Sequence, residues 1–140
     1  AAKRQEASPF HKMALGAFGA GLAYALLAGV SYFSAASGQR SNWLWLAGFY
    51  ALFTLAELYI LPVGLGLFAR LAPAALGATA VAAWFFAAFA GNLASGFLGA
   101  WWSAMTPAAF FLAMGGVMTA SAALLWLIAH AARRIGVTGA

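Results

Sequence analysis

Glu57 is the residue of this chain whose type and position could most readily do chemistry. It is the only acidic residue after the first few, and it lies inside an apolar stretch that covers residues 43–69. A charged side chain at the centre of a bilayer costs ~2.5–3.5 kcal/mol on insertion scales, and such residues face protein or water. The position therefore favours a substrate or proton site. The alternative is a structural acid that is protonated or paired with a Lys or Arg of another helix.

The residues around Glu57 add polar groups to one side of the same helix. Steps of three and four place Tyr50, Thr54, Glu57, Leu61 and Gly64 on one face. The carboxylate then has polar neighbours towards the start of the helix and a small residue towards its end.

A weak point in the backbone follows Glu57. Pro62 cannot donate a backbone hydrogen bond, and its ring clashes with the carbonyl of Leu58. Gly64 and Gly66 follow directly. The segment is either a hinge that gates access to the site or a static bend, and the sequence leaves both interpretations open.

The rest of the chain offers no second catalytic group. Cysteine is absent, and His11 and His130 lie far apart in the sequence, so no metal-ligand spacing occurs. Neither a nucleophile elbow nor a phosphate-binding loop is present. We therefore expect no enzyme activity, no metal and no cofactor.

The composition predicts an all-α integral membrane protein. Hydrophobic residues make up 66% of the 140 residues, charged residues 6%, and the mean hydropathy is +0.92. A soluble domain carries about 25% charged residues. Four apolar spans each exceed the ~20 residues that cross the hydrocarbon core, and none shows the alternation of a barrel strand. These spans cover approximately residues 12–34, 42–69, 74–101 and 107–130.

The distribution of charge predicts the orientation of the spans. The net charge of +5 does not indicate a nucleic-acid partner, because the cations lie in short loops and at the ends. One side of a four-span protein receives six of them, and the other side receives only Arg40. We expect both termini in the cytoplasm of a multi-pass protein of the inner (cytoplasmic) membrane. The six cations are Lys3, Arg4, Lys12, Arg70, Arg133 and Arg134.

The third span carries a stripe of small residues for helix packing. Ala87, Gly91, Ser95 and Gly99 recur every four residues, a spacing that lets helices approach closely in lipid. Asn92 adds a mid-span amide, which is typical of an interhelical hydrogen bond. Trp84 lies in mid-span as well, where core packing is the usual role of tryptophan.

Residues 53–73 and 83–92 resemble a known transporter family. They read FTLAELYILPVGLGLFARLAP and AWFFAAFAGN. The proton-coupled oligopeptide transporter family, within the major facilitator superfamily, has a Glu-Leu-x-x-Ser-Pro-x-Gly-Leu pattern in its tenth helix. A basic residue, a Leu-Ala-Pro helix start and a Trp-Phe-x-x-x-x-x-Gly-Asn pattern follow. The resemblance implies that residues 1–140 are helices nine to twelve, the C-terminal part of the transporter's C-terminal six-helix bundle.

The resemblance also implies a function and a site. In that family the glutamate of the tenth helix receives the amino terminus of the bound peptide, and the matching residue is Glu57. The pocket-lining aromatic residues match Trp84 and Phe85. The implied activity is proton-coupled symport of di- and tripeptides by alternating access. The expected partners are the peptide, the lipid bilayer and the remaining N-terminal helices of the same protein. The chain starts without Met, which fits a piece of a longer protein.

Two departures from the family pattern keep other functions open. Leu61 stands where the family usually has Ser, and Ala87 stands where Ser or Thr is common, so the pocket is less polar. A transporter of the same fold with another small substrate is one alternative. A stand-alone four-helix membrane subunit with a structural role is another. A membrane enzyme is disfavoured because no second catalytic group accompanies Glu57.

Overall fold

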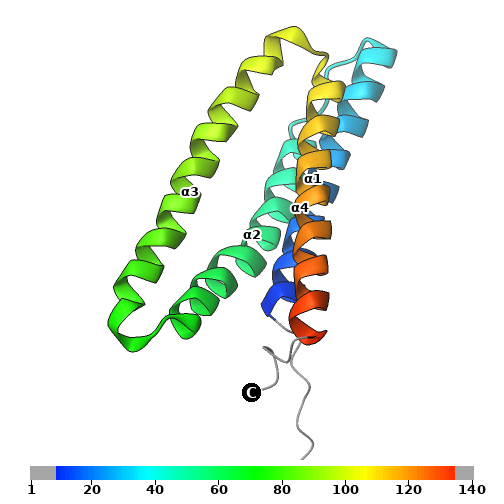
Figure 1. The fold of residues 1–140 in the computed structure, drawn as a ribbon. Coiled ribbons are helices and arrows are strands. Elements are labelled where there is room, and N and C mark those ends of the chain that lie inside the picture. The colour runs from blue at the N-terminus through cyan, green and yellow to red at the C-terminus, as the bar shows by residue number, and fades with distance from the viewer. Residues whose placement is uncertain (1–8, 135–140) are drawn as a thin grey trace, which may run out of the picture.

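Four long helices run back and forth along one axis (Figure 1). The computed structural model describes residues 9–134. The long helices are α1 (Pro9–Ser37), α2 (Leu44–Leu71), α3 (Gly77–Gly99) and α4 (Pro107–Arg134). Short 3₁₀ segments, η1 (Ala74–Leu76) and η2 (Ala100–Ala104), flank α3. Four helical segments are long and apolar enough to cross a membrane, so the predicted all-α membrane architecture is confirmed.

The helix ends extend beyond some of the predicted spans. α1 begins at Pro9, before the predicted start of the first span at residue 12, so His11 and Lys12 lie in its first turn. Within the third predicted span, the regular α-helix ends at Gly99 and the 3₁₀ segment η2 follows. α4 continues to Arg134. Lys3 and Arg4 lie outside the described residues.

Local sequence signals set several of these ends. Pro107 occupies the first turn of α4, where its missing N–H needs no partner. The Ala109 N–H donates to Thr106 Oγ1 at 3.3 Å, so Thr106 caps the helix. At the C-terminal end of α1, Gly38 follows the helix with a φ of 65°, a left-handed conformation that glycine adopts without steric cost.

The helix ends fall into two groups at opposite ends of the bundle. One end of the bundle holds the start of α1, the end of α4 and the connection of residues 72–76 (Figure 1). We call this the basic end, because Lys12, Arg70 and Arg134 belong to it. The loops of residues 38–43 and 100–106 lie at the opposite end, with Arg40.

α1 is the central helix and packs against both α2 and α4. Small residues make these contacts close: a Cβ added at Gly16 would lie 2.7 Å from the Ala56 carbonyl oxygen, and one at Gly21 would lie 2.8 Å from Thr119 Oγ1. Ala23 and Leu27 of α1 form a buried cluster with Phe49 of α2. In lipid, such close approach supplies the dispersion contacts that hold helices together.

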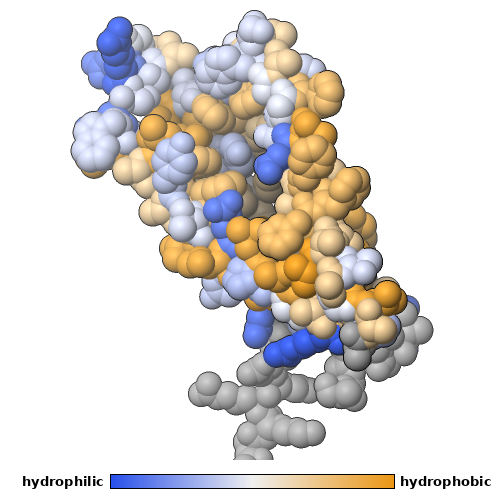
Figure 2. Space-filling view, turned by 90° about the vertical axis from the view of Figure 1, so that its left-hand side faces the viewer, coloured by the Kyte–Doolittle hydropathy of each residue, from blue (hydrophilic) through white to orange (hydrophobic). Residues whose placement is uncertain are grey.

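α3 stands apart from this three-helix core. Among the described helices it contacts α2 but neither α1 nor α4, and none of its described residues is buried. Figure 1 shows α3 joined to α2 near the basic end and diverging from it towards the other end. The face of the molecule on that side is largely hydrophobic, with a few separate hydrophilic patches (Figure 2). α2 and α3 therefore present open faces to lipid or to further protein.

Candidate functional site

Glu57 lies near the middle of α2, on a side of the helix that is not used for contact with α1. The preceding residue, Ala56, is buried and meets Gly16 of α1, whereas Glu57 is exposed. α2 continues as α-helix from Leu44 through Pro62 to Leu71. The backbone therefore holds the carboxylate on a continuous helix and directs it away from the α1 interface.

The predicted neighbours of Glu57 share this open side. Tyr50, Thr54 and Leu61 are all exposed, and Leu61 retains 51% of its accessible surface. The structure thus places these three residues along one accessible strip of α2 with the carboxylate. An accessible carboxylate can accept hydrogen bonds from a cationic group of a ligand, and the hydroxyl oxygens of Thr54 and Tyr50 can accept further ones.

Tyr24 is a residue of this neighbourhood that the sequence analysis did not single out. It lies half-buried on α1, and its ring meets Phe49 and Phe53 of α2 at centroid distances of 5.3 and 5.8 Å. Its hydroxyl is within electrostatic reach of Tyr50 and Glu57. Helical side chains lean towards the start of their helix, and α1 runs opposite to α2, so Tyr24 leans from the level of Phe49 towards that of Glu57. A tyrosine in mid-span was the only sequence signal for it.

Trp84 meets α2 below the carboxylate, towards the basic end. Its indole is half-buried against Gly64, and its ring centroid lies 5.3 Å from that of Phe68. Gly64 follows Glu57 by seven residues, which is about 10 Å along a helix axis. The α2–α3 junction therefore closes the basic end of the open side, and Glu57 lies about two turns above that junction.

The other candidate residues of α3 are exposed. Phe85 has 60% of its surface accessible, and Ala87 is open as well. The predicted packing positions are exposed as well, and they are Gly91, Asn92, Ser95 and Gly99. A Cβ added at Gly91 or Gly99 would meet nothing within 4 Å. Their role in helix packing stays a prediction, and it concerns helices other than α1, α2 and α4.

The three residues of the predicted hinge have different surroundings. Gly64 is buried beneath Trp84, whereas a Cβ at Gly66 would meet nothing within 4 Å, and Pro62 is exposed. Gly64 therefore has a packing reason to be glycine that Gly66 lacks. Among residues 9–134, no group of three His, Cys, Asp or Glu side chains could hold a metal ion.

Comparison with known proteins agrees with this architecture. A family model described as POT family matches residues 1–123 of the 140. No curated protein matches the chain, and no solved structure does. Members of the POT family are proton-coupled peptide transporters of membranes and not enzymes. Four apolar membrane-crossing helices with one intramembrane carboxylate, together with a match over most of the sequence, show that this chain belongs to the POT family.

Proposed function

We propose that the chain forms part of a symporter that moves di- and tripeptides with protons across the cytoplasmic membrane. In this proposal the Glu57 carboxylate binds the amino terminus of the peptide. The supporting observation is that Glu57 is exposed on the open side of α2 while its neighbour Ala56 is buried against α1. A carboxylate away from bulk water gains from a bonded ammonium partner, and the peptide brings that partner.

The remaining N-terminal helices of the same protein supply the rest of the pocket. Glu57 and Asn92 are both exposed within membrane-crossing helices, and polar groups at that depth face protein or water and not lipid. This argues against a stand-alone four-helix subunit. Trp84 and Phe85 form the α3 wall, and Leu61 and Ala87 make the pocket less polar.

Transport proceeds by alternating access, in which one helical bundle rocks against the other around a fixed site. Pro62 and Gly66 allow the lower part of α2 to move, while Gly64 and Trp84 keep it joined to α3. The basic end faces the cytoplasm, because Lys12, Arg70 and Arg134 belong to it and only Arg40 belongs to the other end. Protons are the coupling ion, and no other cofactor is required.

The test is uptake of a labelled dipeptide into liposomes that contain the full-length protein under an inward proton gradient. Unlabelled dipeptide and the same dipeptide with an acetylated amino terminus compete for uptake. In the wild type the free amine should inhibit roughly 10- to 150-fold better, which corresponds to the ~1.5–3 kcal/mol of a hydrogen bond to a charged group. In Glu57→Gln, gradient-driven uptake should be lost, and direct binding to the purified variant should show almost equal affinities for the two peptides. Arg40→Gln is the matched control and should behave as the wild type.

The failures have distinct meanings. Full discrimination between the two peptides in Glu57→Gln would make Glu57 a structural acid and leave the transporter function standing. No dipeptide uptake by folded wild-type protein would favour another small substrate in the same fold. In that case Leu61→Ser and Ala87→Ser, which restore the usual family residues, are the first variants to test.

A further inference from the structure

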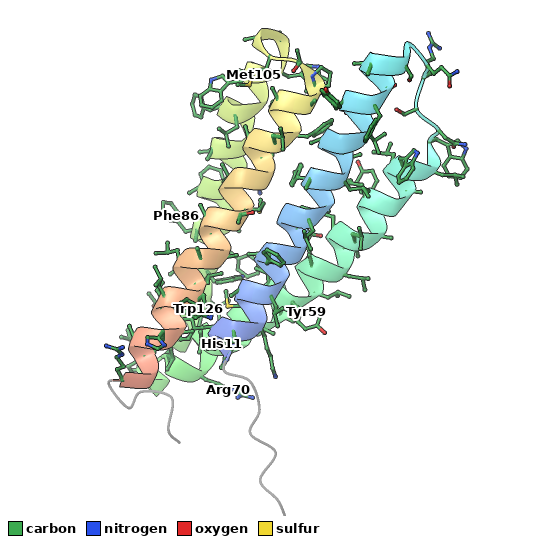
Figure 3. The ribbon with its side chains drawn as sticks, turned by 90° about the vertical axis from the view of Figure 1, so that its right-hand side faces the viewer. His11, Tyr59, Arg70, Phe86, Met105 and Trp126 are labelled. Atoms are coloured by element: carbon green, nitrogen blue, oxygen red, sulfur yellow. The ribbon has the colours of Figure 1, made fainter. Side chains whose placement is uncertain are left out.

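A groove separate from the proposed peptide site runs between α1 and α4 near the basic end. Its volume is ≈ 450 Å³, and its walls are largely apolar, with Leu15 and Phe18 on α1 and Ala123 and Trp126 on α4. No residue of α2 or α3 lines it. Figure 3 labels His11 and Trp126, which lie on the two helices near the basic end. Both helices are long and apolar enough to cross a membrane, so the groove lies between two membrane-spanning helices.

Basic residues lie on α1 and α4 at the same end of the bundle as this groove. His11 lines it, and Lys12 follows, half-buried in the first turn of α1. On α4, the His130 ring stacks on Trp126 at a centroid distance of 5.8 Å and an interplanar angle of 16°. Arg134 follows one turn later. Glu57 is the only acidic residue within residues 9–134, so no described carboxylate neutralises this end.

We propose that this groove binds an anionic phospholipid of the leaflet at the basic end. The acyl chain lies along Leu15, Phe18 and Ala123, and the phosphate lies at the mouth beside Lys12 and Arg134. Three features favour this occupant. The walls are apolar, Lys12 and Arg134 lie at the adjoining ends of α1 and α4, and Trp126 belongs to the residue type that gathers at the membrane interface. Basic pockets between membrane helices are known to accept anionic lipid headgroups.

The first test is native mass spectrometry of the detergent-purified full-length protein with equal amounts of phosphatidylglycerol and phosphatidylcholine. The wild type should retain phosphatidylglycerol in preference. Lys12→Gln and Arg134→Gln should each lower that retention roughly fivefold, the effect of one cation near an anionic lipid surface. Arg40→Gln, at the opposite end, should not. Ala123→Phe should fill the groove and abolish retention, whereas Ala120→Phe, exposed on α4 outside the groove lining, should preserve it.

The second test does not depend on how well the Ala123→Phe variant folds. The protein is placed in phosphatidylcholine bilayers with a small fraction of brominated phosphatidylglycerol, and tryptophan fluorescence is measured. The difference between wild type and Trp126→Phe isolates Trp126. Quenching of Trp126 should exceed that produced by the same fraction of brominated phosphatidylcholine.

Three results would overturn the proposal. Equal retention of the two lipids would remove the role of charge. Undiminished retention in Ala123→Phe would place the lipid elsewhere on the protein. No quenching of Trp126 by either brominated lipid would mean that another part of the protein covers the groove.

Discussion

At the scale of single residues, Tyr24 of α1 lies within electrostatic reach of Glu57 of α2. The Tyr24 ring is fixed by Phe49 and Phe53, and its hydroxyl lies within electrostatic reach of the carboxylate. A hydroxyl held in this way can orient the carboxylate towards a ligand without contacting the ligand itself. Tyr24 is therefore a positioning residue in the proposed mechanism.

Tyr24→Phe should keep the fold and weaken peptide binding. Loss of the hydroxyl removes a polar group that acts electrostatically on the carboxylate, and it predicts a higher KM for the dipeptide with little change in the maximal rate. Uptake kinetics in liposomes measure both values. Tyr32→Phe is the matched control, since Tyr32 is an exposed tyrosine of the same helix whose ring meets Phe33 edge to face. An equal effect in both variants would contradict a specific role for Tyr24.

Gly64 and Gly66 form a second pair whose surroundings differ. A methyl group at Gly64 would collide with the Trp84 indole, and one at Gly66 would meet nothing within 4 Å. Gly64→Ala should therefore lower thermal stability in detergent by the ~1–3 kcal/mol of overpacking, while Gly66→Ala should not. The double variant Gly64→Ala/Trp84→Leu should recover part of the loss, because the smaller side chain removes the collision. Additive losses in the double variant would show that the two residues do not meet.

At the scale of elements, α1 is held to its neighbours by close approach at small residues. α2 comes nearest at Gly16, and α4 comes nearest at Gly21 and Gly115. Thr119 donates its hydroxyl hydrogen to the Gly115 carbonyl at 2.8 Å, so its polar group is satisfied within α4 at this contact. The contacts at Gly16, Gly21 and Gly115 therefore depend on close complementary shape.

Gly16→Ala and Gly29→Ala separate packing from helix propensity. Alanine favours a helix over glycine by ~0.8–1 kcal/mol at either position. At Gly16 the added Cβ would lie 2.7 Å from the Ala56 carbonyl oxygen, so α1 and α2 must separate and the melting temperature should fall. At Gly29 nothing lies within 4 Å, and the melting temperature should stay the same or rise. Thermal unfolding in one detergent compares the two variants, and a fall at Gly29 equal to that at Gly16 would contradict the close contact.

At the scale of the whole molecule, the grouping of the helix ends predicts which loops reach each side of the membrane. These 140 residues contain no cysteine, so a single introduced cysteine is the only thiol within them. Gln39→Cys and Ala75→Cys place thiols in connections at opposite ends of the bundle. In intact cells a membrane-impermeant maleimide should label Gln39→Cys, while Ala75→Cys should react only after permeabilisation. The reverse pattern would invert the proposed orientation.

The open side of α2 and α3 also belongs to this scale. α3 has no buried described residue, although it carries Asn92 and a stripe of small residues. The backbone groups of such a helix bond to one another, whereas its polar and small side chains have no neighbouring helix to pack against among the described residues. The proposed function assigns these partners to the remaining helices of the transporter.

The sequence by itself determined the four membrane-crossing helices, because backbone hydrogen bonding in lipid forces an apolar span of sufficient length to be helical. It also marked Glu57, since a lone carboxylate in such a span is costly wherever it points. The predicted limits of the first and last spans differ from the helix ends at Pro9 and Arg134 by a few residues, because these helices continue beyond the apolar part of their sequence.

Only the tertiary structure decided which residues meet. It separated Gly16 and Gly64, which lie in close contacts, from Gly29 and Gly66, which do not. It brought Tyr24 to the neighbourhood of Glu57 and opened the groove beside Trp126. The physical reason is that these helices are apolar on every side, so hydrophobic periodicity does not mark an inward face. Helix rotation and partner choice are then set by the shapes of side chains that lie far apart in the sequence.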